Sequence, residues 1–249
     1  MFISTTDNWR KAMALNDILV LIILFITNTI QAITGFAGTL LAMPPTIKLI
    51  GVDEAKILLT LVAQISCFLI VLTGLKDINI KEFLKMFILM VVGMFAGIKI
   101  YEHFPMNLLL IFYGIMIIVI AIFKLKGIDS FKLPEAFYPV VIVAAGIIHG
   151  MFASGGALLV IYASHKLAKK EEFRVTMALI WFSLGFYISG VQIQRGYLNA
   201  HVIRLLLIGL IPVFLGTYVG NKLVQHINQA IFMKITYILL ILSGLMAIF

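Results

Sequence analysis

Neutral hydrogen-bond donors gather around two glycine-rich stretches of the sequence. The first stretch, residues 35–41, reads Gly-Phe-Ala-Gly-Thr-Leu-Leu, and the second, residues 154–159, reads Ser-Gly-Gly-Ala-Leu-Leu. Glycine lets a solute approach the main chain, and a helix that restarts after a break presents polarised N–H groups to which anions bind. We therefore predict that two such helix starts hold a small anion. The predicted binding residues are Gln31, Thr34, Gly35, Gly38, Thr39, His149, Ser154, Gly155 and Gly156.

Several of these side chains also have a purely structural interpretation. The hydroxyl groups of Thr34, Thr39 and Ser154 can donate to the carbonyl group four residues earlier in their own helix. A hydrogen bond from His149 to a neighbouring helix explains this residue as well as contact with a ligand does. Gln31 is harder to hide in an apolar helix, because its amide needs several partners, and it favours a polar cavity.

The acidic residues exclude several functional classes. All 11 aspartate and glutamate residues lie in a terminus, in a loop or at the end of an apolar run. Carboxylates inside a membrane usually serve proton relays or cation sites, because a charge in hydrocarbon is costly. The sequence therefore argues against a cation pump and against an intramembrane aspartyl protease. It offers no Ser-His-Asp combination, and its single cysteine has no metal-binding neighbours, so we predict no catalytic residue, no metal, no cofactor and no enzyme activity.

The composition requires the bilayer as the solvent of this chain. Of the 249 residues 62% are hydrophobic and 12% are charged, and the mean hydropathy is +1.12, whereas a soluble domain is about half apolar and about a quarter charged. Backbone groups in hydrocarbon must be satisfied within their own segment, so the spans must be helices. We expect an all-α polytopic membrane protein of about eight transmembrane helices. The expected spans are 17–45, 55–75, 83–101, 106–124, 138–165, 173–193, 201–223 and 231–249.

The first and fifth spans are too long for one straight crossing. Each contains its glycine-rich stretch near the middle, and the first also carries Pro44 and Pro45 near its end. Proline removes a backbone donor and clashes with the preceding turn of a helix. Irregular backbone at membrane depth is tolerated only where it lines a cavity or is buried in protein. We therefore expect helices one and five to be broken.

The two halves of the chain repeat one pattern. Gly38 and Gly156 lie 118 residues apart, and a G-x-x-x-G-x-K motif at residues 93–99 recurs at residues 216–222. Close helix packing is the favoured role of the glycines in this motif. Four spans return a chain to its starting side, so we expect the two halves to share one orientation in the membrane. The predicted four-helix repeats are residues 1–125 and 126–249, within one membrane domain.

The net charge of +8 comes from basic residues that stand near the ends of the spans. Without a stripe of aromatic and basic residues, nucleic-acid binding is not expected, and anchoring to anionic lipid headgroups is the plain interpretation. Lys56 and Arg174 occupy matched positions near the start of spans two and six, each shortly after acidic residues. A local ion pair or an anchoring role is the default for both. A gating or anion-attracting role is the alternative.

These features resemble the TauE/SafE family, the sulfite exporter family of membrane transporters. The resemblance covers the whole chain and lies in the glycine-rich break late in the first span of each half, followed by a span that opens with Glu-Phe-Arg-Val-Thr-Met-Ala-Leu at residues 172–179. The family commonly has a proline about six residues after its glycines. The first half retains Pro44 and Pro45, whereas the second half has Ile161 and Tyr162 instead. The resemblance implies transport of sulfite, organosulfonates or related small anions.

We therefore predict a secondary transporter, and more specifically an exporter, of small anions such as sulfite or organosulfonates. The alternatives are a passive anion channel and a non-catalytic membrane scaffold subunit. The expected partners are a small anionic solute and the lipid bilayer, with a homo-oligomer left open, and the expected location is the plasma membrane with several passes. The sequence does not determine the substrate, the direction of transport, the coupling ion or the orientation in the membrane.

Overall fold

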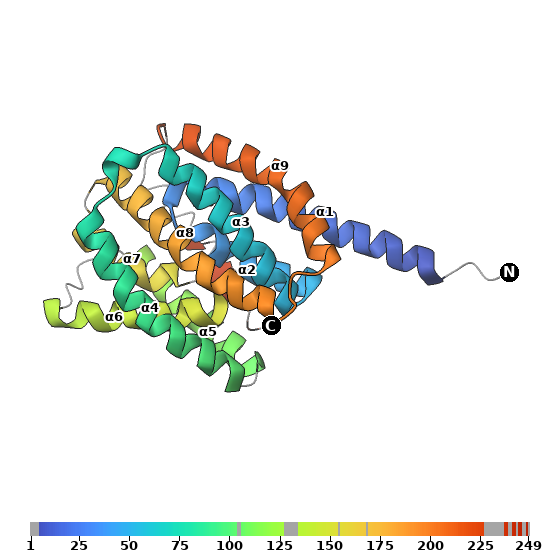
Figure 1. Cartoon of the computed structure of the whole chain (residues 1–249), viewed down its shortest axis with the longest axis horizontal. Helices are drawn as coiled ribbons and strands as arrows, with labels where there is room; N and C mark the ends of the chain where they lie inside the picture. The colour runs from blue at the N-terminus through green and yellow to red at the C-terminus, as the bar shows by residue number, and fades with distance from the viewer. Residues whose placement is uncertain are drawn as a thin grey trace.

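The computed structural model describes residues 5–103, 106–126, 134–153, 155–167 and 169–226, together with 237–238, 241–242, 244–245 and 248. No β-strand occurs in this part of the chain, so the predicted all-helical class is confirmed. Short 3-10 helices, η1 (Leu75–Asp77) and η3 (Glu135–Phe137), accompany the α-helices (Figure 1). The α-helices are α1 (Thr5–Thr34), α2 (Ala37–Ile50), α3 (Val52–Leu72), α4 (Ile80–His103), α5 (Met106–Leu125), α6 (Tyr138–Phe152), α7 (Gly156–Lys166), α8 (Lys170–Gln194) and α9 (Ala200–Leu223).

Six segments of the described chain are long and apolar enough to cross a membrane. They are Leu15–Thr34, Val52–Leu72, Ile80–Tyr101, Glu135–Phe152, Lys170–Gln194 and Ala200–Leu223. Acidic residues stand in the first turn of α3 and of α8, where they complement the positive end of the helix dipole. The expected span at 231–249 falls largely outside the described residues, and the count of eight spans stays a prediction.

The expected span 17–45 is two antiparallel helices rather than one bent crossing. Helix α1 ends at Thr34 and α2 begins at Ala37. The side-chain amide of Asn16, near the start of the apolar part of α1, donates to the carbonyl oxygen of Leu49 at the end of α2, at 3.1 Å. Helix α2 therefore returns toward the end of the bundle from which α1 came. Gly35 makes the reversal possible because its φ of 80° lies in the left-handed region that favours glycine.

The expected span 138–165 has the same construction. Helix α6 ends at Phe152, Ala153 has a left-handed φ of 53°, and α7 begins at Gly156. At the other end of this hairpin the rings of Tyr138 and Tyr162 pack with their centroids 5.3 Å apart. The first residues of α6 therefore lie beside the last turns of α7. We call α1–α2 the first hairpin and α6–α7 the second hairpin.

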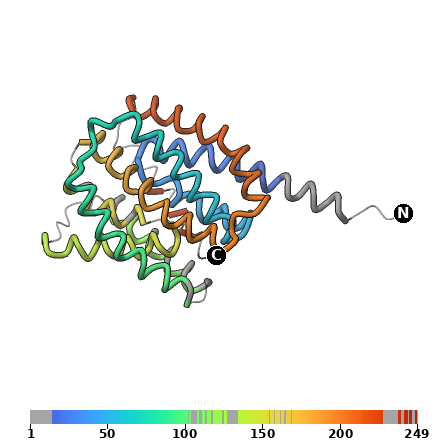
Figure 2. The backbone as a smooth tube through the Cα atoms, viewed as in Figure 1, coloured from blue at the N-terminus to red at the C-terminus, as the bar shows by residue number. Residues whose placement is uncertain are grey.

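The two hairpins enter the bundle from opposite ends (Figures 1 and 2). At one end, which we call the first end, His201 at the start of α9 contacts Asp17 in α1 and Glu54 at the start of α3. At the second end, Tyr162 near the end of α7 donates to Glu82 at the start of α4, at 2.5 Å. The expectation that both halves share one orientation is therefore wrong. The reversal between α1 and α2 adds one helix to the first half of the chain, so five helices rather than four precede α6. An odd number of helices brings the chain to the opposite end of the bundle before α6 begins.

Glycines let two pairs of helices touch through their backbones. A Cβ atom added to Gly97 in α4 would lie 2.0 Å from the carbonyl oxygen of Ile147 in α6. A Cβ atom added to Gly220 in α9 would lie 2.5 Å from the carbonyl oxygen of Thr29 in α1. The predicted packing role of the G-x-x-x-G glycines is confirmed, and it holds α4 on α6 and α9 on α1.

Replacing one of these glycines should destabilise the fold. In Gly97→Ala the new methyl group must push α4 away from α6, which we expect to cost about 1–3 kcal/mol of unfolding free energy. Gly190→Ala is the matched control, because Gly190 also lies inside a helix and has no atom within 4 Å of the added carbon. Thermal unfolding in detergent should show a lower midpoint for Gly97→Ala and an unchanged or higher one for Gly190→Ala. Equal midpoints would contradict the backbone contact.

Candidate functional site

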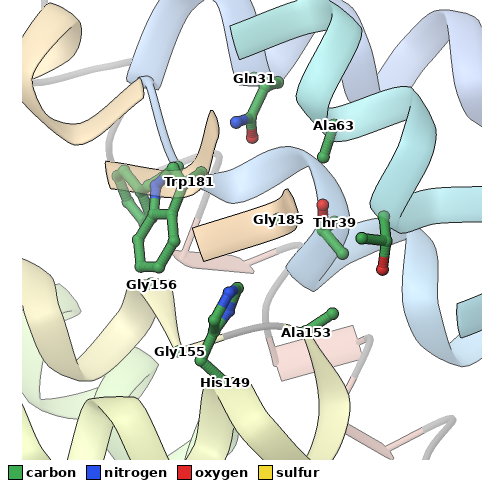
Figure 3. Close-up of a pocket in the computed structure, with 11 residues that line it drawn as sticks. Gln31, Thr39, Ala63, His149, Ala153, Gly155, Gly156, Trp181 and Gly185 are labelled. Atoms are coloured by element: carbon green, nitrogen blue, oxygen red, sulfur yellow. The ribbon is translucent and has the colours of Figure 1, made fainter. Parts of the chain in front are cut away.

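A buried cavity lies where the tips of the two hairpins meet. A Cβ atom on Gly156, at the start of α7, would lie 3.1 Å from the carbonyl oxygen of Phe36 at the first turn-back. The cavity has an empty volume of about 380 Å³, including the space at its open side. Both hairpins contribute to its wall, together with α3 and α8 (Figure 3). Its lining residues are Gln31, Phe36, Thr39, Thr60, Ala63, His149, Ala153, Gly155, Gly156, Trp181 and Gly185.

The start of α2 is capped by the protein itself. The side-chain oxygen of Gln31 accepts from the backbone N–H of Gly38 at 2.6 Å, and its amide nitrogen donates to the sulfur of Cys67 at 3.2 Å. The hydroxyl oxygen of Thr34 accepts from the N–H of Ala37 at 3.2 Å. These side chains occupy the place that an anion would take at an open helix start. The expectation that both helix starts offer unpaired N–H groups is therefore wrong for α2.

The start of α7 differs within the residues that the structure describes. None of the side-chain hydrogen bonds described there joins a side-chain acceptor to the first N–H groups of α7, its N-cap residue is Gly155, and both Gly155 and Gly156 line the cavity. Ser154, predicted as a donor here, lies outside the described residues. A Cβ atom on Gly155 would lie 2.2 Å from the carbonyl oxygen of Ala145, so glycine is required for α7 to fold back on α6. The second hairpin thus presents a helix start to the cavity.

Two buried rings face this helix start without hydrogen-bond partners. His149 is 5% exposed and Trp181 is 7% exposed, and their ring centroids lie 5.1 Å apart (Figure 3). Neither ring nitrogen of His149, nor Nε1 of Trp181, has a partner within the part of the chain that the structure describes. Leaving a buried donor unsatisfied costs about 1–3 kcal/mol. Such groups mark a place that a polar ligand can fill.

The remaining predicted residues lie away from the cavity wall. Thr34 caps α2, Gly35 packs on the backbone of Arg174, and Gly38 packs on Gln31. The ammonium group of Lys56 lies 3.3 Å from the centroid of the Tyr101 ring.

Arg174 lies at the second end and joins three helices. Its guanidinium group donates to the carbonyl oxygen of Ala32 in α1 and to the side chain of Asn221 in α9. Both Lys56 and Arg174 therefore hold helices together in this structure. A gating or anion-attracting role for them stays a prediction.

Trp181 is the main cavity residue that sequence reasoning misses. A tryptophan in an apolar span is more often a packing or interface residue than a binding residue. The repeat contains the signal that could have found it. The offset of 118 residues relates Gln31 to His149 and Ala63 to Trp181, and all four residues line the cavity. The other lining residues not predicted are Phe36, Thr60, Ala63, Ala153 and Gly185.

A helical bundle with six candidate spans around a buried, donor-lined cavity is typical of membrane proteins that bind a solute between their helices. The family model described as "Sulfite exporter TauE/SafE" matches residues 19–247, and the chain belongs to this family. The family match and the six candidate spans make it a multi-pass protein of the plasma membrane.

One curated relative matches part of the chain. It is described as "Probable inner membrane transporter protein TsaS" from Comamonas testosteroni and is 28% identical over 101 residues. The match covers 40% of this chain, and the chain spans only 42% of the length of that relative. No solved structure matches the chain.

The cap on α2 should contribute measurably to stability. Gln31→Met keeps the length and the apolar packing of the side chain but leaves the N–H of Gly38 without its partner, and we expect a loss of about 1–3 kcal/mol of unfolding free energy. Cys67→Ser is the control, because a serine oxygen can still accept from Gln31 and the cap on Gly38 is untouched. Thermal unfolding in detergent would measure both. A Gln31→Met midpoint equal to that of Cys67→Ser would contradict the role of the cap.

Proposed function

We propose that the protein is a secondary transporter, and specifically an exporter, of small anions such as sulfite or organosulfonates. The family description supports export and supports sulfite as the type of substrate. The word transporter in the description of the relative supports carriage of a solute across the membrane. The observation that carries the proposal is the pair of buried, unpartnered rings of His149 and Trp181 beside the start of α7.

The chemistry of the cavity favours an anion. The indole N–H of Trp181 can only donate, and the imidazole of His149 donates through at least one nitrogen. The first N–H groups of α7 add the positive end of a helix dipole. Among the described residues that line it there is no aspartate or glutamate. An anion that accepts from these donors would remove the cost of leaving them unpaired.

The proposed transport cycle uses the two hairpins as moving parts. We propose that residues 1–125 and 126–249 are repeats of one arrangement in opposite orientations, because equivalent positions make equivalent contacts. Gly97 packs on Ile147, and Gly220 packs on Thr29, which lies 118 residues before Ile147. Transporters with inverted repeats expose a site between the repeats to each side of the membrane in turn. Movement of one hairpin tip past the other would open this cavity toward either end.

Removing one donor should weaken transport without unfolding the protein. Trp181→Phe keeps the ring but removes its N–H, and His149→Leu removes both ring nitrogens. Each loss of a hydrogen bond to an anion should cost about 1–3 kcal/mol, or roughly 5- to 150-fold in apparent affinity. Ser183→Ala is the control, because this hydroxyl lies two residues from Trp181 on α8 and donates to Leu179 instead.

Flux of sulfite and of taurine-like sulfonates into proteoliposomes is the measurement. Saturable flux with counter-flow, weakened in both cavity variants and intact in Ser183→Ala, would support the proposed carrier. Unsaturable current would indicate a passive channel, and the absence of flux in the unmodified protein would favour a scaffold subunit. Undiminished flux in both cavity variants would contradict the proposed site.

A further inference from the structure

A histidine joins two carboxylates at the first end of the bundle. The Nδ1 atom of His201 lies 2.6 Å from a carboxylate oxygen of Glu54, and its Nε2 atom lies 2.9 Å from a carboxylate oxygen of Asp17. The side chains are sheltered, with exposed fractions of 25% for His201 and Glu54 and 17% for Asp17. The three residues come from α9, α3 and α1.

The geometry requires an imidazolium ring. A neutral imidazole carries one N–H, so it can donate to only one carboxylate. Its other nitrogen would then face a carboxylate oxygen with a lone pair, at a distance suited to N–H···O bonding. Both contacts are satisfied only when both nitrogens are protonated. We infer that Asp17, Glu54 and His201 form a proton-binding site that ties α1 to α3 and α9.

The surrounding charges balance when this proton is bound. Arg204 donates to the second oxygen of Asp17 at 2.8 Å, and Asn199 donates to the second oxygen of Glu54 at 2.6 Å. Two carboxylates then face one imidazolium and one guanidinium, and the cluster is neutral. Loss of the proton leaves one uncompensated negative charge in a sheltered place. It also leaves one carboxylate without its imidazole donor.

The position of the cluster gives the proton a mechanical consequence. Asp17 follows Asn16, whose amide bonds to Leu49, so the cluster lies at the root of the first hairpin. The tip of the same hairpin supplies Gln31 and Thr39 to the cavity. The root of the second hairpin has a different construction, because among the described residues His165 there approaches one carboxylate, that of Glu135 at 3.4 Å, and stacks on the ring of Tyr138. Proton binding at His201 therefore controls how firmly the first hairpin is held to the bundle.

Nitrogen-15 NMR of the protein labelled at histidine, in nanodiscs, tests the protonation state directly. At about pH 7.5 an ordinary imidazole is mostly neutral. We expect His201, assigned by the signal that is lost in His201→Gln, to show two protonated nitrogens at that pH. Asp17→Asn should convert His201 to a neutral ring at the same pH. A neutral His201 ring in the unmodified protein would overturn the inference.

The temperature of thermal unfolding, measured at several pH values between about 5 and about 9, tests whether the bound proton holds the first hairpin to the bundle. The folded state holds the extra proton, so stability should fall as the pH rises and His201 becomes neutral. We expect a drop of about 2–4 °C that is absent in His201→Gln. His226→Gln is the control, because the ring of His226 approaches the carbonyl oxygen of Lys222 and no carboxylate among the described residues.

The same pH dependence in His201→Gln and in the unmodified protein would overturn the mechanical role. Should His201→Gln fail to fold, Glu54→Gln replaces it, since this variant keeps the ring and removes one carboxylate. Neither measurement requires anion transport, so failure here and failure of the proposed transport function are distinguishable.

Discussion

The fold depends on one constraint, which is that a helix starting inside the membrane must find partners for its first N–H groups. Each hairpin reverses within the bundle and therefore creates such a start. In the first hairpin Gln31 and Thr34 supply the partners from the end of α1, the helix that the chain has just left. In the second hairpin the position equivalent to Gln31 is His149, and among the described residues no side chain takes the role that Gln31 has at α2. The same constraint closes the start of α2 from within the protein, and under our proposal an anion meets it at the start of α7.

Close packing of α4 on α6 and of α9 on α1 fixes the positions of the two hairpins. Helices α4 and α6 touch through Gly97 and Ile147, and α9 and α1 touch through Gly220 and Thr29. In each pair one member belongs to a hairpin and the other does not. The hairpins are therefore fixed along their helices, and the tip of the first hairpin also packs on the backbone of Arg174 near the start of α8. The cavity lies between the two tips and the middle of α3 and α8.

The sequence predicts the places where the helices stop better than it predicts where the chain goes next. Gly35 and Gly155 mark the two interruptions because only glycine fits the conformation or the close approach required there. The reversal of direction is not encoded in composition, since an apolar helix that returns and one that continues need the same residues. The hydrogen bond from Asn16 to Leu49, which defines the return, joins positions 33 residues apart that no local pattern connects.

The cavity shows the same limit of sequence reasoning. The sequence points to Gln31 and His149 because a polar side chain in an apolar helix must face something polar, and both residues line the cavity. The use of Gln31 as a cap depends on the backbone of Gly38, which only the folded hairpin brings within reach. Trp181 has a mostly apolar side chain and becomes a candidate donor only because its buried nitrogen has no partner among the described residues and its ring lies beside that of His149. The sequence therefore predicts which types of residue line the cavity. It does not predict which of them cap a helix start and which are left for the proposed ligand.

The most direct test of the asymmetric site is a structure of the protein soaked with selenite, an electron-rich analogue of sulfite, with the anion located by anomalous scattering. Our account requires one dominant selenium peak at the start of α7, within hydrogen-bonding distance of His149 and of Nε1 of Trp181. A peak at the start of α2, or a cavity that stays empty while selenium binds elsewhere on the protein, would contradict it.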